Sequence, residues 1–169
     1  VKQQRTEVID VRKSSLRDAL AMICATKNIQ NLMIPPYDLP TLITWSSGPK
    51  IYRFNQSIEL LKVNLFDIID AGLTIADGAI ADTGTLIHSN PDRMPRTLSL
   101  VPPIHICMLD VRHIYSNMQT ALRLLEEIKQ MPSNLIFITG PSKTSDIQQT
   151  LAYGAHGPRE LILLLTEGL

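Results

Sequence analysis

The sequence predicts a single α/β domain, residues 1–169, whose sheet has a parallel core. Short apolar runs alternate with helix-length segments in the second half of the chain, which is the order typical of parallel sheets. Residues 161–165 are apolar without alternation, as expected for a strand that is covered on both faces. A chain of 169 residues is long enough for one well-buried domain and short for two.

Composition excludes several classes of function. The 16 basic and 16 acidic residues balance, and no block of like charges occurs, so charge gives no indication of binding to nucleic acid or to an anionic membrane. The sequence has no eighteen-residue apolar span and no signal-peptide pattern. We therefore expect a cytoplasmic protein.

The cysteine and histidine spacing gives no metal motif. Cys24 and Cys107 are far apart and form no C-x-x-C pair, which favours two buried thiols in a reducing compartment. An iron–sulfur cluster or structural zinc would need about four ligands. His105 is the one polar interruption of an apolar strand and lacks a histidine at H-x-H spacing, so a structural role is favoured. We expect no metal and no cofactor in this chain.

The first half of the chain predicts a helix and several short strands. Ser15 and Asp18 resemble a capping box, and apolar residues at helical spacing extend the helix to about Lys27. Residues 7–11 are a short strand or an irregular segment. Residues 31–34 predict a strand that ends at two prolines.

The second half predicts strand, helix, strand, helix, strand. An apolar strand covers residues 97–109, interrupted by prolines, and a helix capped by Ser116 then buries a stripe that starts at Met118. Residues 135–139 form the next strand. Ser145 and Gln148 have capping-box spacing, so a helix follows and ends near Gly154.

Three polar segments are candidates for a site. Residues 140–144 lie between a strand end and a helix start, where free backbone N–H groups bind anions. The turn at residues 82–85 is either a simple hairpin or a cradle for an oxyanion. Residues 154–159 supply His156, which could carry a proton or simply pack in a turn, and Arg159, which could bind an anion or be a solvated charge.

These segments carry a family resemblance. TGPSKTSDI at residues 139–147, GAHGPR at residues 154–159 and IADTGTL at residues 80–86 together resemble the LUD-domain family. The resemblance covers roughly residues 32–165 and adds little to the first thirty. The family usually has arginine at the position of Lys143, and lysine keeps the charge without the bidentate fork.

The resemblance implies the fold shared by sugar-phosphate isomerases, glucosamine-phosphate deaminases and coenzyme A transferases. It also implies a role in bacterial conversion of L-lactate to pyruvate, together with iron–sulfur partner proteins. Ligands of parallel sheets bind outside the carboxyl ends of the strands, so the three segments should meet there. The chain could bind a small carboxylate or phosphate ligand, or dock its partners. Two alternatives are a free-standing isomerase or acyl-transfer enzyme and a metabolite sensor.

Convergence of the three segments would define the following candidate site. The acid–base candidates are His156, Asp146 and Asp82, although Asp146 could instead serve only the start of a helix. Arg96 precedes an apolar segment and could be a solvated charge or lean over a strand end. The expected ligand-binding residues are Thr83, Gly84, Thr85, Arg96, Gly140, Ser142, Lys143, Thr144 and Arg159.

Overall fold

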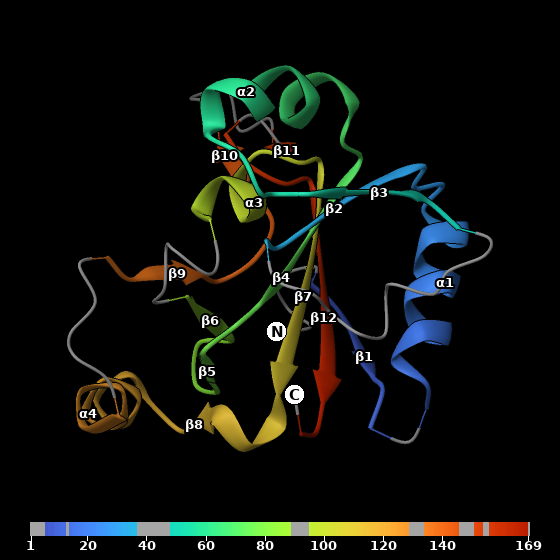
Figure 1. Ribbon diagram of the computed structural model, residues 1–169. Coiled ribbons are helices and arrows are strands. Elements are labelled where there is room, and N and C mark those ends of the chain that lie inside the picture. Colours follow the sequence, from blue (N-terminus) through green and yellow to red (C-terminus); the bar gives the residue numbers. More distant parts are fainter. Residues whose placement is uncertain are drawn as a thin grey trace.

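The structure is a computed structural model that describes residues 6–12, 14–36, 48–88, 95–128, 134–145, 151–153 and 156–168. In this part of the chain, six strands form one parallel sheet (Figure 1). Their order across the sheet is β1 (Thr6–Asp10), β12 (Glu160–Thr166), β7 (Ile104–Asp110), β4 (Ala71–Ile75), β2 (Asn31–Ile34) and β3 (Lys50–Arg53). The predicted α/β class with a parallel core is confirmed.

Helix α1 (Leu16–Thr26) covers one face of this sheet (Figure 1). Its buried residues pack with Ile106 and Met108 of β7 and with Ile162 and Leu164 of β12. The Ser15 hydroxyl accepts a hydrogen bond from the Asp18 N–H, as the capping pattern predicts. The predicted run at residues 161–165 is buried from both sides, because its odd-numbered residues face the opposite side from α1.

The opposite face carries short helices and a second sheet. The second sheet has the order β8 (Ile114–Tyr115), β5 (Gly78–Ile80), β6 (Thr85–His88) and β9 (Ile136–Ile138). The helical elements outside α1 are α2 (Ile58–Val63), the π-helical turn η3 (Asn64–Ile68), α3 (Arg96–Leu100), the 3-10 turn η4 (Val111–His113) and α4 (Met118–Ile128). A further pair consists of β10 (Lys143–Ser145) and β11 (Leu151–Tyr153).

The helix predicted from Ser145 to about Gly154 is wrong. Residues 143–145 and 151–153 are strands that pair antiparallel, with Lys143 opposite Tyr153. A capping pattern satisfies only the first turn of a helix, and a strand ladder can override so weak a local preference. Asp146, Gln148 and Gly154 lie outside the described residues.

The placement of residues 135–139 in the parallel sheet is also wrong. Strand β9 pairs antiparallel with β6 in the second sheet, so β12 follows it in sequence without being its neighbour. Residues 96–100 form helix α3 in place of the predicted strand, and the helical residues 58–68 had no predicted counterpart. Short apolar runs do not distinguish a strand from a buried helical turn by periodicity alone.

The predicted helix after residue 116 is present as α4, with two differences. Asn117 caps it, because its side-chain oxygen accepts a hydrogen bond of 2.9 Å from the Thr120 N–H. Met118 is 41% exposed and so does not belong to the core, whereas Ala121 is fully buried. The helix contacts β5 and β8 and covers the second sheet, as expected.

Gly72 is the second residue of β4. A Cβ atom at this position would overlap the carbonyl oxygen of Leu98 and come within 3.1 Å of Pro102. The absent side chain therefore lets α3 pack directly on the sheet backbone. The position of α3 depends on this contact.

We predict that Gly72→Ala lowers the free energy of unfolding by about 1–3 kcal/mol, because α3 must move away from the sheet. Urea unfolding measures the change. Gly168→Ala is the control. Gly168 has a φ of 76°, and a Cβ atom there would meet no other atom within 4 Å. This variant therefore tests the effect of backbone strain without steric overlap. An equal loss in both variants would contradict the steric explanation.

Asp110 ends β7 and is 3% exposed. Its carboxylate accepts hydrogen bonds from the backbone N–H groups of Arg112 at 2.9 Å and Gly168 at 3.0 Å. The guanidinium of Arg112 also donates to this carboxylate, which holds the pKa of Asp110 well below its usual range. The carboxylate thereby joins the start of η4 to the end of the chain.

We predict that Asp110→Ala lowers the free energy of unfolding at pH 7 by about 0.5–2 kcal/mol, the usual loss for a capping acceptor. Because the folded-state pKa lies below the unfolded value, this stability is present above about pH 4 and is lost as the pH falls further. Urea unfolding at pH 7 and pH 3 should therefore show a smaller difference between variant and parent at pH 3. A difference independent of pH would contradict the role of the ionised carboxylate.

Candidate functional site

Two of the three polar segments meet through a chain of hydroxyl groups. The β5–β6 hairpin turns at residues 81–84, where Gly84 has a φ of 64°. Thr83 Oγ1 lies 2.7 Å from Thr85 Oγ1, which lies 3.0 Å from Thr139 Oγ1. Thr139 directly follows β9, and β9 pairs with β6, so this contact is a consequence of the second sheet.

The third segment joins at Ser142. The Ser142 N–H donates a hydrogen bond of 2.7 Å to the carbonyl oxygen of Pro158. A Cβ atom on Gly157 would lie 3.2 Å from Ser142 Cβ, so a larger residue there would press on the loop after β9. The predicted convergence of the three segments is therefore present in the structure.

A cavity of roughly 190 Å³ lies where these segments meet. Its polar side chains come from α3, β7 and the loops after β9 and before β12, and its apolar wall comes from β9, α3 and the start of β12. The described lining residues are Ser99, Leu100, His105, Ile136, Phe137, Ile138, Thr139, Gly140, Ser142, His156, Gly157, Pro158 and Leu161. Neither a carboxylate nor a lysine or arginine is among these described lining residues.

The cavity is at the opposite edge of the parallel sheet from the one predicted. His105 is the second residue of β7 and Leu161 the second of β12, so the cavity lies near the amino ends of these strands. The prediction relied on β9 being one of the parallel strands, which would have brought its carboxyl end to the usual ligand edge. Because β9 belongs to the second sheet, that argument does not apply.

Three predicted site residues line the cavity: Gly140, Ser142 and His156. His156 is exposed, and Thr85 is buried at 4% exposure behind Thr139. Asp82 and Thr83 are exposed on the hairpin turn, where the Asp82 N–H donates to the carbonyl oxygen of Ser116.

The predicted cations lie around this region without lining it. The described lining residues do not include Lys143, Arg96 or Arg159, all of which have exposed side chains. The Arg159 N–H donates to the Pro103 carbonyl, and the Arg96 carbonyl accepts from the Ser99 hydroxyl. The side chain of Thr144 and all of Asp146 lie outside the described residues.

Sequence reasoning missed Ser99 and His88, and it favoured only a structural role for His105. Burial lowers the pKa of His88 to about 4 and that of His105 to about 3, so both imidazoles are neutral at neutral pH. Burial also raises the pKa of the Cys107 thiol to about 12. The i, i+2 spacing of His105 and Cys107 could have indicated a shared face, but nothing local shows that β6 brings His88 beside them.

The sequence model of the LUD domain matches residues 5–166. The chain belongs to the LUD-domain family. One relative is an uncharacterized protein of Neisseria meningitidis serogroup B, 38% identical, with the match covering 95% of this chain and 71% of the relative. Lactate utilization protein C of Anoxybacillus flavithermus is 26% identical over 94% of this chain and 74% of its own length.

A solved structure also resembles this LUD-domain chain. It is a DUF162 family protein from Deinococcus radiodurans with a TM-score of 0.67 and 23% sequence identity, covering 95% of this chain and 88% of the other. At that identity the likeness supports the fold alone. Across the described residues of the LUD domain, no helix is long and apolar enough to cross a bilayer.

We predict that Thr85→Val and Thr139→Val each lower the free energy of unfolding by about 0.5–1.5 kcal/mol, because each removes a hydrogen bond at the junction. The double variant should show a coupling of at least about 0.5 kcal/mol, as expected for residues in contact. Thermal and urea unfolding of the four proteins provide the cycle.

The control combines Thr85→Val with Thr166→Val, since Thr166 donates to the Leu109 carbonyl and belongs to a separate hydrogen bond. These two changes should add to within about 0.5 kcal/mol. If the losses of unfolding free energy for Thr85→Val and Thr139→Val are also additive, the hydrogen bond between these two hydroxyl groups contributes nothing to stability.

Proposed function

We propose that this LUD-domain protein binds a small carboxylate or phosphate ligand in the cavity, as a component of a bacterial system that oxidises L-lactate to pyruvate. The observation that carries the proposal is the meeting of all three polar segments at one cavity. Ser142 and Gly157 come from two of the segments and line it together. Thr85 of the third segment lies directly behind the lining residue Thr139.

The chemistry of the lining supports a small anion. Hydroxyl groups of Ser99, Thr139 and Ser142 and the imidazole of His156 offer hydrogen-bond donors. The apolar wall formed by residues 136–138 would accept the carbon part of a short acid, and the small volume disfavours a large cofactor.

The role in lactate oxidation is supported by the names of relatives. The proteins of Anoxybacillus flavithermus and Bacillus subtilis that match this chain are each named lactate utilization protein C. The proposal includes iron–sulfur proteins as partners, which the family resemblance implies, and no cluster in this chain. It also keeps the cytoplasmic location expected from the sequence, with which the free thiols Cys24 and Cys107 are compatible.

Partner docking at the same place is a second candidate function, favoured by an apolar rim. Leu100 and Phe137 line the cavity and are 42% and 40% exposed. Exposed apolar residues at the mouth of a cavity are typical of a surface that a partner covers. The isomerase or acyl-transfer alternative has less support, because Asp82 does not join His156 among the described lining residues.

We predict that lactate, pyruvate or a sugar phosphate raises the thermal midpoint of the purified protein. A ligand at about one hundred times its dissociation constant adds roughly 2.7 kcal/mol of stability. Ser142→Ala and His156→Ala should each reduce the shift by lowering affinity about tenfold, as expected when a hydrogen bond to a charged ligand is lost. Differential scanning fluorimetry with a panel of these compounds measures the effect.

Matched controls lie away from the cavity. His113→Ala removes another exposed histidine, on η4, and Ser116→Ala removes an exposed serine, and both should leave the shift unchanged. Equal loss in the controls would assign the effect to global stability. If none of the compounds shifts the thermal midpoint, ligand binding is contradicted and the docking function is favoured. A pull-down with the iron–sulfur proteins then tests docking.

A further inference from the structure

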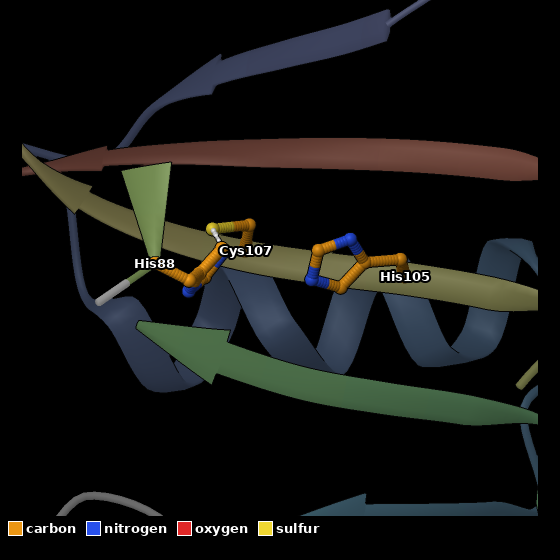
Figure 2. Close-up of side chains that lie close together, drawn as sticks. All are labelled: His88, His105 and Cys107. Carbon is orange, nitrogen blue, oxygen red and sulfur yellow. Dashed lines mark hydrogen bonds between the residues drawn. The ribbon is translucent and has the colours of Figure 1, made fainter. Parts of the chain in front are cut away.

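A buried cluster of His88, His105 and Cys107 lies between the two sheets, next to the cavity. Their exposed fractions are 4%, 1% and 0%. Figure 2 shows His88 and Cys107 side by side, with His105 nearer the start of β7 and its ring turned toward them. One ligand atom from each residue can be chosen so that all three lie within 4.8 Å of one another.

Two strands from different sheets assemble the cluster. Residues 105 and 107 are two apart on β7, so their side chains lie on the same face of the parallel sheet. That face meets the second sheet, whose strand β6 ends at His88. Sulfur and nitrogen from the two sheets thus come together, with His88 Nε2 at 3.8 Å from Cys107 Sγ.

The cluster leaves polar atoms unsatisfied. The Nδ1 atoms of His88 and His105 are both buried and have no hydrogen-bond partner. A buried polar atom without a partner costs about 1–3 kcal/mol, so such groups are rare and call for an explanation. A bound metal ion would supply such a partner beside the Cys107 thiol.

The donor set matches a transition metal ion. Imidazole nitrogen and thiolate sulfur are the ligands that zinc prefers, and this cluster offers two imidazoles and one thiol. The Thr74 hydroxyl lies 2.7 Å from His105 Nε2 and can orient this ring, the role that outer partners have around metal-binding histidines. His105 also lines the cavity, so the cluster borders the cavity on the side of this residue.

We propose that His88, His105 and Cys107 form a binding site for a divalent transition metal ion of the zinc class, with a fourth position facing the cavity. Metal–nitrogen bonds of about 2.0 Å and a metal–sulfur bond of about 2.3 Å require ligand separations near 3.5 Å, so the side chains close by roughly 1 Å on binding. The Cys107 S–H proton is replaced by the metal and leaves to solvent. The site does not depend on the identity of the anionic ligand.

The experiment uses cobalt(II) as a spectroscopic probe on the full chain, reduced and stripped of metal with a chelator. One equivalent should produce a thiolate-to-cobalt charge-transfer band in the near ultraviolet and the visible bands of a tetrahedral site, and zinc should displace them. Cys107→Ser and Cys107→Ala should both lose the charge-transfer band. Cys24→Ser, which changes the other buried free cysteine, should retain it.

Further variants separate a metal site from a buried polar cluster. His88→Gln and His105→Gln should weaken cobalt binding at least tenfold, whereas His113→Gln should not. Thr74→Val should keep the cobalt spectrum but lower the affinity by roughly 10–100-fold, as outer-partner changes do. Circular dichroism checks that each variant is folded. Lack of a charge-transfer band in the folded parent, or its persistence in both Cys107 variants, would overturn the proposal.

Discussion

The burial of β7 on both faces is the constraint on which the rest of the structure depends. This strand lies between β12 and β4, so neither of its edges is exposed to solvent. Ile106 and Met108 pack toward α1, and Cys107 and Leu109 pack toward the second sheet. A histidine and a cysteine on that second face must therefore be satisfied from within the protein or by a bound group.

The register of β4 prepares the space around these residues. Gly72 is opposite His105 and Thr74 is opposite Cys107 in the parallel ladder. The glycine lets α3 approach, and α3 supplies Ser99 and Leu100 to the cavity wall. The threonine gives His105 a hydrogen-bond partner. Gly72 and Thr74 of β4 therefore determine how closely α3 approaches the sheet and how the His105 imidazole is oriented.

Sequence reasoning succeeded where burial alone decides the structure. The unbroken apolar run at 161–165 predicts a strand with two covered faces, and the serine cap predicts the start of α1, because both signals are local. It failed for residues 145–154, where pairing of β10 with β11 overrides a capping pattern. A short stretch of sequence does not show which strand it will pair with, so β9 was assigned to the wrong sheet for the same reason.

The candidate site shows the same division, since the segments around Thr85, Ser142 and Gly157 could be chosen from their glycines and hydroxyls. The edge at which they meet, and the place of His88 beside β7, depend on tertiary structure alone.

His105 connects the two parts of the molecule that carry its proposed chemistry. Its ring lies at the border between the polar cavity and the buried cluster, and burial keeps it uncharged. A neutral imidazole with one nitrogen held by Thr74 can present its other nitrogen without rotating, because the hydrogen bond fixes the ring plane. A charged ring at this buried position would lose its hydration without gaining a counter-charge, and the neutral ring avoids that cost. His105 can therefore border the cavity and belong to the cluster without a change of charge.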